Sequence, residues 1–171
     1  MKKIIIFIYC VTIISFVHAQ KNIPVTDTLF IEGKIKSNLY FSTGQLAEIK
    51  SSDIPDLPIL DHTGTIKRTV KGLQGFLLKQ LLEKAELTAE SAKLNSEFYF
   101  VLVGSDGYKV VYSWNELFNT ETGNHVYVVT SKEGVPVNTM DERILVLSDK
   151  DFKTGRRYVK GVKKIIVGRV E

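Results

Sequence analysis

The sequence predicts a single α+β domain, made mostly of β-strands with one main helix at about residues 75–86 and short helices elsewhere. Short runs of β-branched and aromatic residues recur between turn-forming residues along most of the chain. Only one stretch has apolar residues at the spacing of a substantial helix. The length of 171 residues, with 44% apolar and 25% charged side chains, suits one globular domain and excludes a disordered or collagen-like chain.

Residues 1–19 have the pattern of a secretory signal peptide. Lys2 and Lys3 precede an apolar run from Ile4 to Val17, and Ala19 supplies the small residue before the cleavage point. This run is shorter than the roughly 20 residues that span a bilayer as a helix. We therefore expect an exported protein, periplasmic or secreted, with no stable membrane insertion.

Cleavage after Ala19 divides the rest of the chain into a flexible lead-in over 20–27 and a folded domain over 28–171. It also removes Cys10, which is the only cysteine. The exported protein is then expected to have no disulfide, no thiolate metal ligand and no thiol nucleophile.

The strands are expected where β-branched and aromatic residues gather between turn signals. Their ranges are 28–35, 57–61, 65–70, 98–103, 108–112, 126–129, 143–147, 158–159 and 164–167. The main helix is predicted from apolar residues that recur three and four positions apart, namely Phe76, Leu77, Leu78, Leu81, Leu82 and Ala85. Ser42 with Gln45, and Ser113 with Glu116, have the spacing of capping boxes that open short helices.

Charge is distributed unevenly after residue 19. Residues 150–171 contain eight basic and two acidic side chains, whereas residues 20–149 contain 13 basic and 17 acidic ones. A basic C-terminal segment on an acidic body indicates an anion site or a surface for an unknown protein partner. Nucleic acid is not an expected partner, because the protein is expected to be exported and its net charge after cleavage is only +2.

The order of several motifs resembles the oxidoreductase molybdopterin-binding domain family, which has the sulfite-oxidase-like fold. The likeness runs from about residue 28 to 169, in a short secreted form. Its motifs are LFIEGKI at 29–35, GLQGFLLKQLL at 72–82, GSDGY at 104–108, YSWNEL at 112–117, DERILV at 141–146 and GRRYVKGVKKI at 155–165.

The resemblance implies a molybdenum held by a pterin dithiolene and one protein cysteine. No cysteine follows Cys10, and the segment around residues 60–69 offers Asp61, His62 and Thr63 in its place. Oxygen and imidazole donors belong to a different ligand class from a soft thiolate. No cofactor and no metal ligand are therefore expected, although the resemblance leaves molybdopterin binding possible.

Five residues are candidates for a binding site. The resemblance places anion contacts at Arg143, Arg157 and Lys160, and the planar guanidinium suits the phosphate of a pterin. His62 is expected to be exposed beside a turn glycine, and the Tyr108 hydroxyl is expected to line a pocket. The alternative is that the basic side chains are simply solvated, that His62 is a turn residue and that Tyr108 packs across a hairpin.

Two functions follow. The first is an exported binding or accessory protein for a small anionic or pterin-like ligand, built on a molybdopterin-binding-like scaffold without molybdenum catalysis and with no catalytic residue assigned. The second is a periplasmic molybdenum-cofactor-dependent oxidoreductase with an atypical metal ligand near His62.

Overall fold

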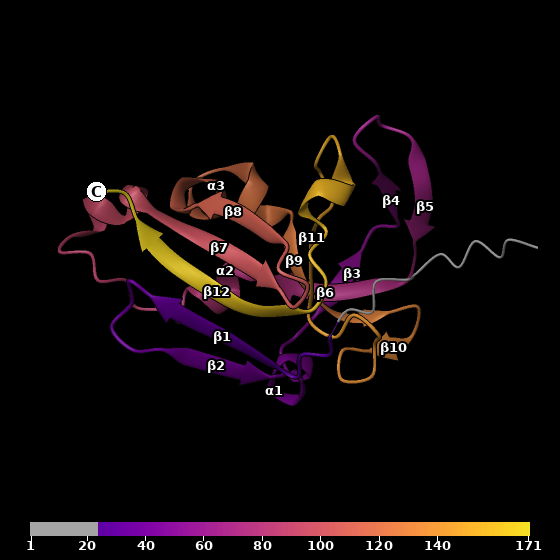
Figure 1. Cartoon of the computed structure of the whole chain (residues 1–171), viewed down its shortest axis with the longest axis horizontal. Coiled ribbons are helices and arrows are strands. Elements are labelled where there is room, and N and C mark those ends of the chain that lie inside the picture. Colours follow the sequence, from indigo (N-terminus) through magenta and orange to yellow (C-terminus); the bar gives the residue numbers. More distant parts are fainter. Residues whose placement is uncertain (1–23) are drawn as a thin grey trace, which may run out of the picture.

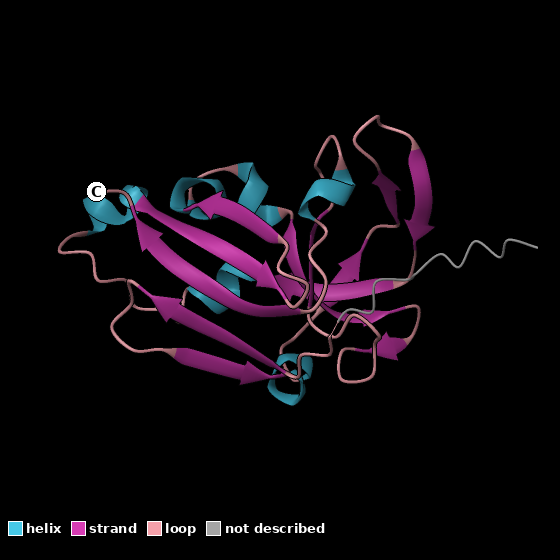
Figure 2. Cartoon of the chain, in the orientation of Figure 1, coloured by secondary structure: helices cyan, strands magenta, loops and turns pink. Residues whose placement is uncertain are grey.

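A computed structural model describes residues 24–171 (Figure 1). The expected signal peptide and the first part of the lead-in lie outside these residues, and residues 24–27 form neither helix nor strand. Strands dominate the described chain and the helices are few and short, which confirms a mostly-β α+β fold (Figure 2). No helix between residues 24 and 171 is long and apolar enough to cross a membrane.

The strands alternate with short connections throughout. They are β1 (Thr28–Gly33), β2 (Leu39–Ser42), β3 (Ser52–Ile54), β4 (Leu57–Leu60), β5 (Ile66–Val70), β6 (Leu73–Leu77), β7 (Phe98–Gly104), β8 (Lys109–Ser113), β9 (Val126–Lys132), β10 (Val135–Pro136), β11 (Leu145–Ser148) and β12 (Val162–Arg169). The helices are α1 (Thr43–Ala47), α2 (Leu78–Leu82) and α3 (Trp114–Phe118), with 3-10 helices η1 (Ala92–Glu97), η2 (Glu121–Asn124) and η3 (Thr154–Arg157).

Two larger sheets and one hairpin make up the fold. The first sheet has the order β2-β1-β12-β7-β8, in which β1 and β12 are parallel and the other neighbours antiparallel. The second has the order β10-β9-β6-β3, with β11 paired to β9. Strands β4 and β5 form a separate hairpin that projects from the body (Figure 1). The basic C-terminal segment is therefore no free tail, because its second half contains β12, the middle strand of the first sheet.

The core has two parts. The larger part joins the inner face of the first sheet to α2 and α3, and it contains the fully buried Leu29, Phe100 and Leu81. The smaller part lies between the second sheet and the β4–β5 hairpin, and Tyr158 belongs to it. The β4–β5 hairpin is thus fixed to the body through its buried residues Leu57 and Ile59.

Both predicted capping boxes are confirmed. At the start of α1 the Ser42 amide donates to Gln45 Oε1 at 2.9 Å and the Gln45 amide donates to Ser42 Oγ at 3.2 Å. At the start of α3 the same reciprocal pair joins Ser113 and Glu116 at 2.8 and 3.1 Å. These bonds satisfy amides that a helix of five residues leaves without intrahelical partners.

The prediction of a helix over 75–86 was wrong in its limits. The helix α2 covers only Leu78–Leu82, and Gly75 to Leu77 belong to β6. The apolar positions were assigned correctly to the core, since Phe76, Leu81 and Ala85 are buried. Strand β6 forms because it has partners on both sides, β3 and β9, and such long-range pairing overrides the local helical spacing.

At Gly75 the backbone of β6 lies close to that of β9. A Cβ atom there would lie 2.4 Å from the Val128 carbonyl oxygen and 3.0 Å from Ile54 Cδ1. The pairing of β6 with β9 also shifts register between Gln74 and Gly75. A residue without a side chain is therefore required at the bulge.

Gly75→Ala is expected to lower the free energy of unfolding by about 1–3 kcal/mol, because a main-chain oxygen cannot move away as a side chain does. Urea denaturation measures this loss. Gly44→Ala in α1 is the matched control, since its nearest neighbour is Ser42 Oγ at 3.7 Å. The control should unfold at the same or slightly higher urea concentration, and equal losses in both variants would contradict the assignment of β6.

Candidate ligand pocket

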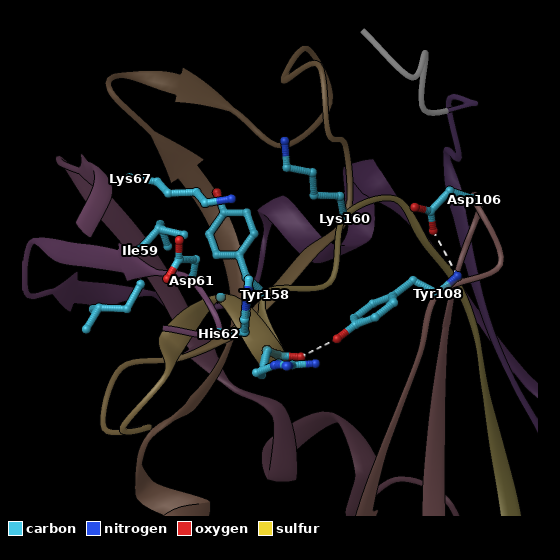
Figure 3. A pocket seen from close by; sticks show the side chains of 11 residues that line it. Ile59, Asp61, His62, Lys67, Asp106, Tyr108, Tyr158 and Lys160 are labelled. Carbon is cyan, nitrogen blue, oxygen red and sulfur yellow. Dashed lines mark hydrogen bonds between the residues drawn. The ribbon is translucent and has the colours of Figure 1, made fainter. Parts of the chain in front are cut away.

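The main candidate site is a pocket of about 460 Å³ where three turns meet. One turn joins β4 to β5, the second joins β7 to β8, and the third is the segment from η3 to residue 160 (Figure 3). The lining residues are Ile59, Leu60, Asp61, His62, Lys67, Asp106, Tyr108, Gly155, Arg156, Tyr158 and Lys160. This volume lies within the range of roughly 300–1,000 Å³ that small-molecule sites occupy.

Hydrogen bonds from η3 hold the pocket walls in place. Thr154 Oγ1 donates to the Pro58 carbonyl at 2.5 Å and accepts from the Leu60 amide at 3.1 Å. Lys153 Nζ donates to the carbonyl oxygen of His62. On the other side the Tyr108 hydroxyl donates to the Arg156 carbonyl at 2.7 Å (Figure 3). The η3 segment therefore ties both hairpin turns to one backbone.

The two acidic residues of the pocket are engaged in their own turns. Asp61 Oδ1 accepts from the Thr63 hydroxyl at 2.6 Å and from the amides of Thr63 and Thr65 at 2.8 and 3.1 Å. The hydrogen bond from the Thr63 side chain is the main reason that the pKa of Asp61 falls to about 2. Asp106 Oδ1 accepts from the Tyr108 amide at 2.9 Å. These carboxylates shape the turns that carry the pocket residues.

The positive charges of the pocket come from three elements. Lys67 lies on β5, Arg156 in η3 and Lys160 in the segment before β12. Within residues 24–171, neither Lys67 nor Arg156 forms an ion pair. Lys160 Nζ lies 3.4 Å from Glu142 Oε1, and Lys132 donates to Glu142 Oε2 at 2.5 Å.

Glu142 is a single buried carboxylate between two lysines. Burial raises its pKa, but the hydrogen bond from Lys132 and the charges of Lys132 and Lys160 outweigh that effect, so the pKa is lowered. One negative charge thus faces two positive ones. A net positive charge remains beside the pocket on the side of Lys160.

Tyr158 packs beneath the pocket between two cations. Its ring centroid lies 5.7 Å from Arg68 Cζ and 6.0 Å from Lys160 Nζ. Its hydroxyl is buried without a hydrogen-bond partner in the described part of the chain, and burial raises its pKa. Tyr158 was assigned to a short strand by the sequence analysis, and only an isolated bridge between Val159 and Val146 is present there.

The structure brings together three of the five predicted site residues. His62, Tyr108 and Lys160 all line the pocket, although they come from distant parts of the sequence. Sequence reasoning missed Lys67, Arg156 and Tyr158. The one available signal for Arg156 and Tyr158 was their place beside Arg157 and Lys160 in the basic segment, and nothing local distinguishes Lys67 from other strand lysines.

Arg157 lies outside this pocket and is engaged with acidic residues. Its Nε and Nη2 donate to the two carboxylate oxygens of Asp151 at 2.6 and 2.5 Å, and Nη1 donates to Glu116 Oε1 at 3.2 Å. Its guanidinium also lies 4.7 Å from the ring centroid of Tyr112, whose buried hydroxyl has no partner among residues 24–171. The guanidinium donors that would bind a phosphate are therefore already bonded to a carboxylate of the same chain.

Arg143 also lies away from the pocket. Its Nε donates to Asp27 Oδ1 at 3.0 Å and its Nη1 donates to the Met140 carbonyl at 2.9 Å. The residue has a positive φ of 49°, so β11 begins only at Leu145 rather than at residue 143. Arg143 therefore holds the segment at 24–27 against the loop before β11.

Internal ion pairs account for much of the uneven charge. Four basic residues of the C-terminal segment pair with carboxylates of the acidic body, and Arg157 also pairs with Asp151 within its own loop. The pairs are Arg157 with Asp151 and Glu116, Lys160 with Glu142, Lys164 with Glu32, and Arg169 with Glu90 and Glu97.

Comparisons with known proteins give a fold and no family. No protein-family model matches the chain, and no curated protein matches it. The solved structure of the sulfane dehydrogenase SoxCD from Paracoccus pantotrophus is similar, with a TM-score of 0.59 and 12% identity over 85% of this chain. The match covers 40% of the SoxCD chain. The likeness shows a shared fold and carries no activity to this chain.

The described residues do not fit the molybdenum cofactor that the family resemblance of the sequence implies. They contain no cysteine and no group of three His, Cys, Asp or Glu side chains that could hold a metal. Asp61, at the place where a ligand was sought, already accepts three hydrogen bonds within its turn. The Nε and Nη2 donors of Arg157 are already bonded to Asp151. Only the positive charge of the pocket suits an anionic group of a ligand.

Arg157→Ala is expected to destabilise the fold rather than to empty a ligand site. It leaves Asp151, whose side chain is 13% exposed, without its bidentate partner. Breaking a buried pair costs about 3–5 kcal/mol, and partial solvent access should reduce this loss to about 2 kcal/mol. Thermal and urea unfolding measure it.

Arg156→Ala is the matched control for stability, because Arg156 is the exposed neighbour without an ion pair among residues 24–171. It should unfold within about 0.5 kcal/mol of the unchanged protein. Equal stability of the two variants would show that the Arg157–Asp151 pair does not support the fold.

Proposed function

We propose that this protein is an exported binding protein that holds a small anionic ligand in the pocket at η3, on a scaffold like that of molybdopterin-binding domains and without molybdenum catalysis. The observation that carries the proposal is the convergence of Lys67, Arg156 and Lys160 on one pocket, where three positive charges stand against the two carboxylates of Asp61 and Asp106. The export rests on the signal-peptide pattern of residues 1–19.

The lining favours a ligand that combines an anionic group with a planar ring. Two lysines act as point charges, and the guanidinium of Arg156 supplies a planar set of donors for a phosphate or carboxylate. Tyr108, which is 41% exposed, and His62 offer ring surfaces at the opening. A pterin phosphate has both features, and so do other phosphorylated heterocycles.

The oxidoreductase alternative rests on the fold likeness to SoxCD. It requires a metal ligand near His62, and the described neighbours of His62 supply no cluster of donors for one. The proposed binding protein needs no such ligand. Such a protein would bind its ligand through Lys67, Arg156 and Lys160, which line the pocket.

Lys160→Gln and Lys67→Gln are each expected to weaken the binding of a pterin monophosphate by about 10- to 100-fold. A hydrogen bond to a charged group is worth about 1.5–3 kcal/mol, and each variant removes one. Quenching of the pterin fluorescence measures the dissociation constant.

Lys150→Gln is the control for net charge, because Lys150 is exposed and does not line this pocket. It should leave the affinity within about twofold. A titration with inorganic phosphate shows whether the anionic group alone is recognised. Absence of binding to both probes, or equal loss in all three variants, would contradict the proposed site.

A further inference from the structure

A second pocket adjoins the pocket at η3 and shares Arg156 with it. It has a volume of about 580 Å³ and lies where η2, the end of β11 and the loop between β11 and η3 meet. In Figure 1 this loop and the β4–β5 hairpin project on the same side of the body. We call this second pocket the η2 pocket, and its lining includes His125, Lys150, Asp151, Lys153, Arg156 and Arg157.

Hydrogen bonds fix the loop that carries Lys150. The hydroxyl of Ser148, which is a buried residue, donates to Asp151 Oδ1 at 2.9 Å. Asp151 also accepts from Arg157 Nε at 2.6 Å. Because Ser148 and Asp151 stand on either side of Lys150 in the chain, its backbone is held at the η2 pocket while the residue itself stays exposed.

Positive charge exceeds negative charge among the residues that line the η2 pocket. Arg157 is bonded through Nε and Nη2 to Asp151, which supplies the carboxylate of the lining. Beside this pair the lining contains three further cations, Lys150, Lys153 and Arg156. All three residues are exposed, and none of them forms an ion pair within residues 24–171.

Two further carboxylates lie beside the η2 pocket without lining it. Asp149 Oδ1 lies 2.9 Å from His125 Nδ1, and Glu121 Oε1 lies 3.4 Å from His125 Nε2. Only 6% of the Asp149 side chain is exposed. Even with both carboxylates counted, the four cations of the η2 pocket outnumber the three carboxylates in and around it. The lining therefore suits an anionic group.

The two pockets meet at Lys153 and Arg156. Arg156 lines both pockets, and its carbonyl accepts a hydrogen bond from the Tyr108 hydroxyl at 2.7 Å. Lys153 lines the η2 pocket and donates to the His62 carbonyl, in the turn that borders the pocket at η3. A guanidinium has five N–H donors in one plane, which is enough for two oxyanions at once. Two anionic groups that both contact Arg156 must lie close together in the ligand.

We infer that the η2 pocket is a subsite for a second phosphate, so that the ligand of this protein is a diphosphate. The first phosphate lies between Arg156 and the lysines of the pocket at η3, and the second lies between Arg156 and Lys150. A diphosphate fits this arrangement because its two phosphates share one oxygen and can both contact one guanidinium. The inference rests on the proposed function and names the ligand class of the same site.

Fluorescence titrations of the full chain with pterin monophosphate and with pterin diphosphate test the inference. They are made without divalent cations, because such cations bind diphosphate themselves. The measured quantity is the ratio of the two dissociation constants, since a loss of folded protein affects both constants equally. The diphosphate should bind about 10- to 100-fold more tightly, because its second phosphate gains charge-assisted hydrogen bonds.

Lys150→Gln should lower this ratio at least about fivefold, because it removes a cation that contacts only the second phosphate. Lys163→Gln is the matched control for net charge. Lys163 is an exposed lysine of β12 that lines neither pocket. Its substitution should leave the ratio within about twofold.

A chain that binds pterin monophosphate but binds the diphosphate no more tightly would overturn the inference and leave the proposed function standing. A ratio that Lys150→Gln leaves unchanged, or that Lys163→Gln lowers by the same factor, would also overturn the inference. Absence of binding to both pterins would contradict the proposed function itself and the inference with it.

Discussion

The pairing of β12 between β1 and β7 is the constraint on which the rest of the structure depends. It places the last strand of the chain in the middle of the larger sheet, parallel to the first strand and antiparallel to β7. The buried Ile165 and Val167 complete the core beneath that sheet. Because β12 is fixed there, the segment just before it must run past the turn between β7 and β8. The pocket exists because this segment passes between two hairpin turns.

The same constraint explains how the charges are used. Strand β12 and its flanks bring a basic segment against an acidic body, so that Arg157, Lys164 and Arg169 find carboxylate partners. These residues support the fold, and their charges are not available to a ligand. Lys67 and Arg156 form no ion pair among residues 24–171, although the charge of Lys67 acts on Asp61, and Lys160 shares one carboxylate with Lys132. The binding proposal rests on this remaining positive charge and not on the total charge of the segment.

Local patterns predicted what is locally determined. The capping boxes at Ser42 and Ser113 followed from short-range spacing, because their hydrogen bonds close within three residues. Most strands followed from runs of β-branched and aromatic residues between turn signals. The helix over 75–86 was wrong because two distant strands pair with β6. The sequence predicted an anion contact at Arg157 because a guanidinium binds anions well. The anion that it binds is the Asp151 carboxylate, which only the folding of the loop brings to it. Lys67 and Tyr158 became site residues only through three-dimensional proximity, which no spacing in the sequence expresses.

The central claim is that a scaffold like that of a molybdenum enzyme binds an anion here without the metal. Elemental analysis together with pterin fluorescence, on the protein exported by a host that makes molybdenum cofactor, tests this claim most directly. The account predicts molybdenum far below one atom per chain, whether or not a pterin is retained at Lys67, Arg156 and Lys160. One molybdenum and one pterin per chain would contradict it and would require a metal ligand that the pocket does not show.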